Sequence, residues 1–155
     1  MSDTSIQRIV VGVDGSDCSK AALAWALWQA ELSGAQVEAV SAYQDLTMYE
    51  YGLGDVPPPL PAESLSLLAQ KSLDQSIEEV AAGLGHPVQV VTRVESGRAA
   101  EILPELAKGA SMLVVGSHGH GSFAGMLLGS VSQHCVLHPS CPVVVVPSPV
   151  ATVNA

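Results

Sequence analysis

The sequence predicts an α/β fold in which helices cover both faces of a parallel sheet. Short runs rich in β-branched residues alternate with longer stretches of helical periodicity along the 155 residues. Apolar residues make up 48% of the chain and aromatic residues only 4%, which suits short buried strands wrapped by Ala-rich helices. This length is typical of one domain, and neither an internal repeat nor a second domain is apparent, so we treat 1–155 as one unit.

The first part of the chain predicts a strand, a helix and a second strand. The apolar run Ile9–Val13 ends in Asp14-Gly15-Ser16, a turn sequence, and either Ser16 or Ser19 could then cap a helix. Apolar residues recur at helical spacing over Lys20–Leu32, and Gly34 is a helix stop. Val37–Ala42 is the second predicted strand.

Residues 43–62 have a different composition and predict a flexible surface excursion. Gly52, Gly54 and the prolines from Pro57 to Pro61 cannot continue a helix or a central strand.

The remaining elements continue the alternation of helix and strand. Gly83 and Gly85 are expected to end the first of these helices, and Pro104 fits awkwardly in the second. The predicted elements are helix Ser64–Leu84, strand Val88–Val94, helix Ala99–Lys108, strand Met112–Gly116, helix Ser130–Leu137 and strand Val143–Val146. Strands separated by helices pair in parallel, and ligands bind at the carboxyl ends of such strands, where the strand order reverses.

The charge of the chain excludes some kinds of partner. The formal net charge is −9, and the six Lys and Arg are spread along the chain, so we expect no nucleic-acid binding and no docking on anionic lipid. A nucleotide remains a suitable ligand, because backbone N–H groups and a divalent ion can hold phosphates.

The sequence also carries a prediction about location. The N-terminal residues show no signal peptide, and no apolar run approaches the ~20 residues that span a bilayer. Cys18, Cys135 and Cys141 form no C-x-x-C pair, so we expect reduced thiols and a cytoplasmic protein.

Two predicted strands end in glycine-rich sequence that points to a phosphate site. Gly116 and Gly119 lack Cβ atoms, so a ligand can approach their backbone, and they can adopt positive φ and turn N–H groups inward. Gly129 precedes a helix whose first turn has unpaired N–H groups and a positive dipole end, and Ser130 adds a hydroxyl donor. A phosphate group fits this arrangement.

Motifs for cleaving a nucleotide are not apparent. The sequence has no G-x-x-x-x-G-K-[ST] loop, no G-x-S-x-G elbow and no H-E-x-x-H. The pattern therefore favours holding a nucleotide over hydrolysing it, with weak hydrolysis by a metal-activated water left open.

The spacing G-x2-G-x9-G-S from Gly116 to Ser130, together with Val11–Ser16, resembles the ATP-binding branch of the universal stress proteins over residues 6–148. The resemblance implies a three-layer sandwich of the adenine-nucleotide alpha-hydrolase-like type, with five parallel strands in the order 3-2-1-4-5. It also implies a homodimer through the last strand, Val143–Val146, and a nucleotide-dependent regulatory or stress-response role. Magnesium or manganese would bridge the phosphates.

The same resemblance implies roles for individual residues. Those at the ends of the first two strands would hold the adenosine: Gly12, Val13, Asp14 and Ala42. Those around the glycine-rich loop would flank the ribose and hold the phosphates: Val115, Gly116, Gly119, Gly129, Ser130 and Val131. Candidates for further contacts on the phosphate side are His118, His120 and Ser132.

One departure concerns the two histidines, because many bacterial members have Arg in this loop. Histidine has an unperturbed pKa near ~6.5. If His118 and His120 face the phosphates, ATP affinity should rise as pH falls.

Several plainer interpretations stay open. Asp14 could be a turn residue or helix cap, and Ser130 a helix cap. His134 and His138 have a spacing that can bind zinc, although no acidic or thiol pair completes such a site. Trp25 and Trp28 are expected to be partly buried, and Cys18 to be an inert buried thiol. Functional alternatives are a slow ATPase, a binder of another adenine nucleotide such as cyclic AMP, and a purely structural protein.

Overall fold

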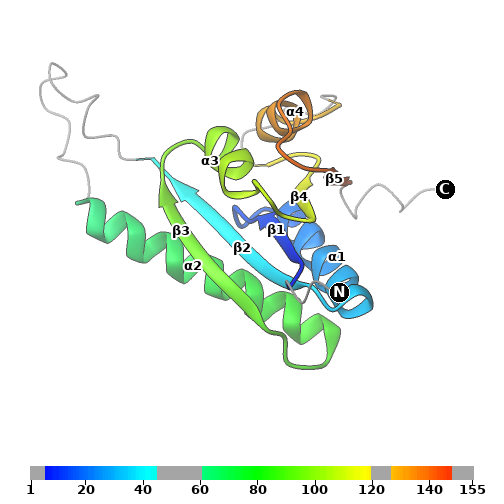
Figure 1. Cartoon of the computed structure of the whole chain (residues 1–155). Helices are drawn as coiled ribbons and strands as arrows, with labels where there is room; N and C mark the ends of the chain where they lie inside the picture. The colour runs from blue at the N-terminus through cyan, green and yellow to red at the C-terminus, as the bar shows by residue number, and fades with distance from the viewer. Residues whose placement is uncertain (1–5, 45–60, 120–126, 148–155) are drawn as a thin grey trace, which may run out of the picture.

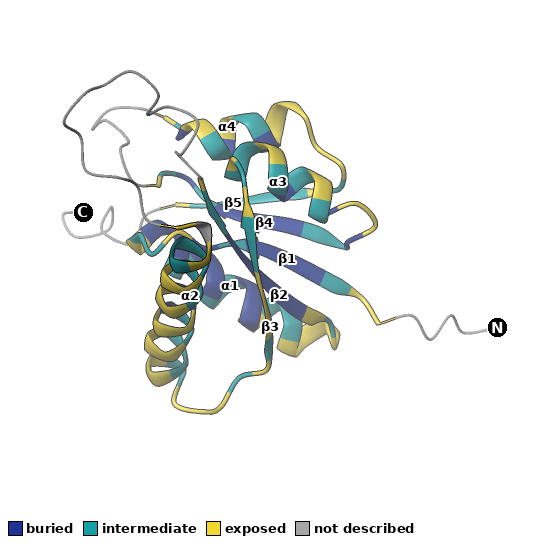
Figure 2. Ribbon diagram, turned by 90° about the vertical axis from the view of Figure 1, so that its left-hand side faces the viewer, coloured by how far each residue is buried: buried dark blue, intermediate teal, exposed yellow. Residues whose placement is uncertain are grey.

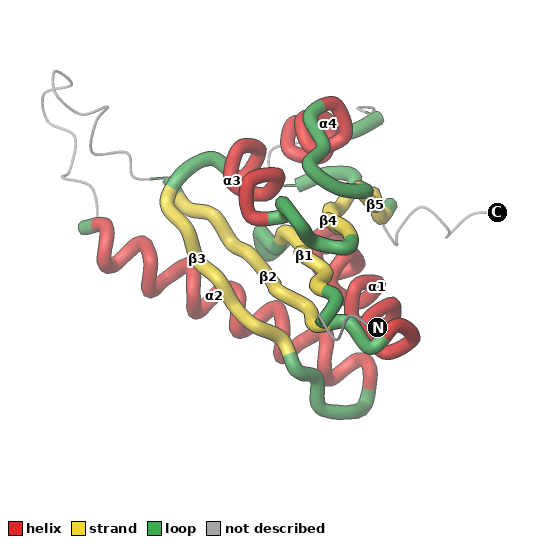
Figure 3. Tube along the Cα trace, viewed as in Figure 1, coloured by secondary structure: helices red, strands yellow, loops and turns green. Residues whose placement is uncertain are grey.

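The computed structural model describes residues 6–44, 61–119 and 127–147, which form a parallel sheet with helices on both faces (Figures 1 and 3). Most of the predicted excursion 43–62 and all of His120 lie outside these residues. The elements in chain order are β1 (Arg8–Gly12), α1 (Asp17–Ser33), β2 (Gln36–Tyr43), α2 (Ala62–Leu84), β3 (Val90–Ser96), α3 (Ala99–Leu106), β4 (Met112–Gly116), α4 (Ser130–Leu137) and β5 (Val143–Val146).

The sheet has the predicted topology. Its strand order is β3-β2-β1-β4-β5, and every neighbouring pair is parallel. Val11 on β1 lies opposite Ala39 on β2 and Val114 on β4. The chain builds outward from β1 in one direction through β2 and β3, and then in the other direction through β4 and β5. The order therefore reverses between β1 and β4, where ligands bind in sheets of this kind.

Alternating side chains of the central strands form two cores, one on each face of the sheet. Figure 2 shows the central strands coloured mainly as buried, between helices on the two faces of the sheet. Ile9 and Val11 on β1 belong to the core beneath α1 and α2, whereas Val10 belongs to the core beneath α3 and α4. All three are at most 1% exposed. A strand buried on both faces needs a continuous apolar run, which is why β1 could be recognised from sequence.

Local signals account for most element ends, but the role of Gly83 at the end of α2 and the bounds of β3 differ from the prediction. Ser16, not Ser19, is the N-cap of α1, because its side chain accepts a hydrogen bond from the Ser19 N–H. Gly85 ends α2 with φ 78°, but Gly83 lies inside that helix and does not end it. Strand β3 begins at Val90 and extends to Ser96, because its pairing with β2 runs from Val37 to Tyr43.

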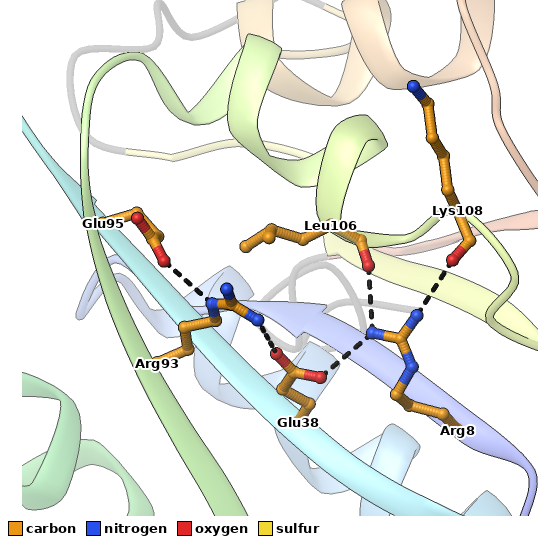
Figure 4. Close-up of polar contacts among 6 residues, drawn as sticks. All are labelled: Arg8, Glu38, Arg93, Glu95, Leu106 and Lys108. Carbon is orange, nitrogen blue, oxygen red and sulfur yellow. Dashed lines mark hydrogen bonds and ion pairs between the residues drawn. The ribbon is translucent and has the colours of Figure 1, made fainter.

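A polar network that links β1, β2 and β3 to the end of α3 was not predicted (Figure 4). Glu38, buried on β2, accepts from Arg8 at 3.0 Å and from Arg93 at 3.4 Å. Arg8 also donates to two carbonyls at the end of α3, those of Leu106 at 2.9 Å and Lys108 at 3.0 Å. These bonds hold α3 over the sheet, next to the reversal point.

Among the helices that the structure describes, none has the length and apolar character needed to cross a membrane.

Candidate functional site

A cavity lies at the carboxyl ends of β1, β2 and β4, beside the point where the strand order reverses. The starts of α3 and α4 complete its wall. The lining residues are Gly12, Val13, Asp14, Ser19, Val40, Ala42, Ala99, Leu103, Val115, Gly116, His118, Gly119, Gly129, Ser130, Val131 and Ser132.

The cavity brings together the residues that the sequence singled out. All ten positions predicted to hold ATP line it, as do His118 and Ser132, and His120 falls outside the described residues. Sequence reasoning missed four lining residues, Ser19, Val40, Ala99 and Leu103. The i, i+4 spacing of Ala99 and Leu103 shows that they share one face of α3, but only the packing of that helix reveals that this face meets the cavity.

One end of the cavity is apolar. It is lined by Val40 and Ala42 of β2 and by Leu103 of α3. The Leu103 side chain packs against Gly12: a Cβ built on Gly12 would lie 2.7 Å from a Leu103 methyl carbon. The absence of a side chain at position 12 therefore lets α3 close over the end of β1. This end could accept a flat apolar group such as a nucleobase.

Asp14 belongs to a hydrogen-bonded turn as well as to the cavity wall. Its Oδ1 accepts from the backbone N–H of Ser16 at 2.9 Å and from the Ser16 hydroxyl. The Asp14 N–H in turn donates to the Ser19 hydroxyl at 3.2 Å. The plainer interpretation of Asp14 as a turn residue is thus correct, and it coexists with a position at the ligand cavity.

Gly116 and Gly119 do not adopt the positive φ that was one of the two reasons expected for glycine there. A Cβ on Gly116 would lie 2.8 Å from the Cys18 carbonyl carbon, so α1 occupies that space. A Cβ on Gly119 would lie 2.5 Å from Oδ2 of Asp14. Helix α1 therefore leaves no room for a side chain at position 116, and at position 119 the Asp14 carboxylate would have to move.

The N-terminus of α4 lines the cavity, and the described residues place neither a side-chain cap nor an acidic residue in its first turn. Gly129 is the N-cap, so the interpretation of Ser130 as the cap is wrong, and no side chain caps the helix. The helical ladder begins with Gln133 N–H to Gly129 C=O at 2.9 Å, which leaves the N–H groups of the first turn without intrahelical acceptors. That turn carries no acidic residue. The N-terminus of α4 can therefore accept an anion.

Ser132 plays a structural part that the phosphate-side prediction did not foresee. Its hydroxyl, which is buried, donates to the carbonyls of Ser117 and Gly129, both at 3.0 Å. The Gly129 N–H also donates to Ser117 C=O, at 2.7 Å. These bonds join the end of β4 to the start of α4. Because its one proton is used, the Ser132 hydroxyl does not donate to a ligand in this arrangement.

The histidines have separate environments. His118 lines the cavity, and its Nδ1 lies 3.1 Å from the Ser117 hydroxyl. His134 and His138 stack against each other on α4, with ring centroids 4.6 Å apart. Within residues 6–44, 61–119 and 127–147, no group of three or more His, Cys, Asp or Glu side chains could hold a metal ion.

Cys18, Trp25 and Trp28, which were expected to be buried or partly buried, lie outside the cavity lining. Cys18 is buried, as expected. Trp25 packs against the core beneath α1, whereas Trp28 is 52% exposed.

Comparison with known proteins identifies the family. The model of the universal stress protein family matches residues 5–147. The chain belongs to the universal stress protein family. Universal stress proteins of Mycolicibacterium smegmatis (strain ATCC 700084 / mc(2)155) and Mycobacterium tuberculosis (strain ATCC 25618 / H37Rv) are 36% and 38% identical to it over 141 residues. These matches cover 89% and 88% of the chain but 45% and 44% of the relatives, so this universal stress protein spans about half their length.

Solved structures of the family share the fold. A universal stress protein described as a complex with cAMP is 27% identical, with a TM-score of 0.68 over 94% of this chain and 99% of that one. UspA from Lactobacillus plantarum is 21% identical and also has a TM-score of 0.68, covering 93% and 99% of the two chains. The predicted five-stranded order is thus shared with known universal stress proteins.

Proposed function

We propose that this universal stress protein binds ATP in the cavity and acts as a nucleotide-dependent regulatory or stress-response protein. The observation that carries the proposal is the start of α4, where uncapped N–H groups face a cavity whose other end is apolar. A nucleotide needs both features, since its base is flat and largely apolar and its phosphates are anionic. Support also comes from the 27% identical universal stress protein that is described as a complex with cAMP.

The apolar end of the cavity would hold the base of the nucleotide, and the end at the start of α4 would hold its phosphates. Ala42 and Leu103 would contact the base, and Asp14 would accept a hydrogen bond from the base or the ribose. Ser130 and Val131 would bind phosphate oxygens through backbone N–H groups, with the Ser130 hydroxyl as a further donor.

Magnesium or manganese would accompany the phosphates. Asp14 is the one carboxylate among the described residues that line the cavity, and no metal-binding group of three or more side chains occurs in the described part of the chain. This donor set suits an ion that is held chiefly by phosphate oxygens and water, which is how Mg²⁺ commonly binds nucleotides.

Replacement of Ser130 by Asp tests the proposal directly. The new carboxylate would interact favourably with the α4 dipole, by about 0.3–1 kcal/mol, while it repels the phosphates. We expect ATP affinity to fall at least tenfold in calorimetric titrations, with no loss of stability in urea unfolding.

Gln133→Glu is the matched control, because it adds the same charge to an exposed position of α4 that does not line the cavity. This control should bind ATP within about twofold of the wild type. Equal ATP affinity in Ser130→Asp and Gln133→Glu would rule out the start of α4 as the phosphate site.

Cyclic AMP is the second candidate ligand, and the 27% identical universal stress protein in complex with cAMP favours it. Mass spectrometry of nucleotide extracted from freshly purified protein separates the two candidates, as does competition between ATP and cyclic AMP. Slow ATP hydrolysis is a further alternative that a single-turnover assay would detect.

The pH dependence of ATP affinity expected from the sequence can be tested at His118. This residue lies in the connection between β4 and α4 and lines the cavity, so a positive charge on its ring would lie near the proposed phosphate position. ATP affinity should be higher at pH 6 than at pH 8, with the metal held saturating, and His118→Asn should remove the difference. Equal affinity of the wild type at the two pH values contradicts this part of the proposal.

We also propose a homodimer through β5, which lies at one edge of the sheet with four half-buried valines. The carbonyls of Pro142 and Val146 accept from β4, so alternation directs the Val145 N–H toward the open edge. Val145→Pro would remove that donor and leave the pairing with β4 in place. Light scattering should then show a monomer where the wild type is a dimer; a Val145→Pro dimer contradicts pairing through β5. The cytoplasmic location remains a prediction from the sequence.

A further inference from the structure

Ser19 is a cavity residue whose hydroxyl has an unexpected role. It lies in the first turn of α1, is 5% exposed and lines the cavity beside Asp14. Ser16 supplies the helix cap, so the Ser19 hydroxyl is not needed for capping.

The hydroxyl of Ser19 closes a ring of hydrogen bonds with the preceding turn. It accepts from the Asp14 N–H at 3.2 Å and donates to the Ser16 carbonyl at 2.9 Å. The Ser19 N–H donates to the Ser16 hydroxyl at 3.2 Å, and that hydroxyl donates to Oδ1 of Asp14. Both the backbone and the side chain of Asp14 are therefore held by this ring.

The hydroxyl of Ser19 is not a donor to a ligand in this arrangement. A serine hydroxyl has one proton, and here that proton goes to the Ser16 carbonyl. Replacement by Ala would leave the Asp14 N–H and the Ser16 carbonyl without this partner. The effect of Ser19 on a ligand would therefore be indirect, through the placement of Asp14.

The ring places Asp14 where the two strand-end loops meet. Oδ2 of Asp14 lies so close to Gly119 that a Cβ there would be 2.5 Å away. The carboxylate therefore stands between the β1–α1 turn and the β4–α4 loop, both of which line the cavity. A shift of the turn would move the carboxylate relative to any ligand that both loops contact.

We propose that Ser19 is a positioning residue of the nucleotide site, which holds Asp14 in place for contact with the adenosine. The proposal rests on the proposed function. It makes the cavity a site whose polar contact to base or ribose depends on a buried serine in α1. Ser19→Ala should then weaken ATP and adenosine binding about tenfold each, while tripolyphosphate binding changes less than twofold.

Three variants test the proposal by calorimetric titration. Ser19→Thr should restore affinity, because a helical threonine hydroxyl can also bond to the i−3 carbonyl. Ser76→Ala, which removes an equally buried hydroxyl from α2, is the matched control and should bind as the wild type does. The double variant Ser19→Ala/Asp14→Ala should bind no more weakly than Asp14→Ala alone, because Ser19 acts through Asp14.

Additive losses in the double variant, or Ser19→Ala affinity equal to that of the wild type, would overturn the positioning role. A wild type that binds no ATP overturns the proposed function instead. The ring is then tested without ligand, by hydrogen exchange at the Asp14 amide. Faster exchange in Ser19→Ala than in Ser76→Ala supports the placement of Asp14 by Ser19, and equal exchange overturns it.

Discussion

Replacement of Gly116 by Ala tests whether close packing of α1 against β4 shapes the candidate site. The added Cβ would lie 2.8 Å from both the carbonyl carbon and the Cβ of Cys18, where ordinary contacts begin at 3.4 Å. The two segments would have to separate by about 0.6 Å, and two of the three nearest atoms belong to helix backbone, which a rotamer change cannot move. Overpacking of this kind costs about 1–3 kcal/mol. We therefore expect the free energy of unfolding in urea to fall by that amount.

Gly83→Ala is the matched control, since it makes the same chemical change inside α2, where nothing lies within 4 Å of the new Cβ. It should stabilise the protein by about 0.5–1 kcal/mol, because glycine is unfavourable within a helix. Cys18→Ala should not rescue Gly116→Ala, because the backbone atoms and Cβ of residue 18 remain. A Gly116→Ala protein within about 0.5 kcal/mol of the wild type would refute this account of the glycine.

Three further predictions concern the cavity wall, the buried ion pair and the thiols. Gly12→Ala should cost less stability than Gly116→Ala and be relieved by Leu103→Val, because the new Cβ meets only the flexible end of that leucine. Glu38→Ala should lower the unfolding free energy by about 1–3 kcal/mol, whereas Glu105→Ala, which breaks an exposed pair with Lys108, should change it by less than about 0.5 kcal/mol. Burial raises the pKa of the Cys135 thiol to about 11 from 9.0, so the unfolded chain loses its proton first and stability should fall as pH rises from 9 to 11. Urea unfolding measures all three effects, and Cys135→Ala should remove part of the alkaline loss; an unchanged pH profile would contradict the burial of that thiol.

Local sequence patterns predicted the fold because the elements that decide it are long or strongly patterned. The apolar run of β1 is buried on both faces, and the helical periodicity of α2 extends over 23 residues. Strand β3 was placed two residues early at its start because its bounds depend on pairing with β2, which no local pattern reports. The Glu38 network was missed for the same reason, since its arginines are 30 and 55 residues away in sequence.

The location of the candidate cavity was predictable from the sequence, but the packing around its glycines was not. The spacing from Gly116 to Ser130 correctly placed a glycine-rich loop at the end of β4. Sequence alone could not show that Cys18 of α1 fills the space beside Gly116, because that contact depends on how the helix packs on the sheet. Ser19 and Leu103 were missed likewise, since only tertiary packing turns them toward the cavity.

The residues at the start of α4 differ from those at the starts of the other described helices, and the difference favours anion binding at α4. Of the four helices that the structure describes, α1 begins with a serine cap and Asp17, and α2 and α3 each carry a glutamate in the first turn. The start of α4 has neither a side-chain cap nor an acidic residue. In a chain of net charge −9, a helix start left free of acids next to a cavity is conspicuous. A carboxylate in the first turn of α4 would stabilise that helix, so its absence leaves α4 less stable than it could be. This is expected if a bound phosphate takes the place of the carboxylate.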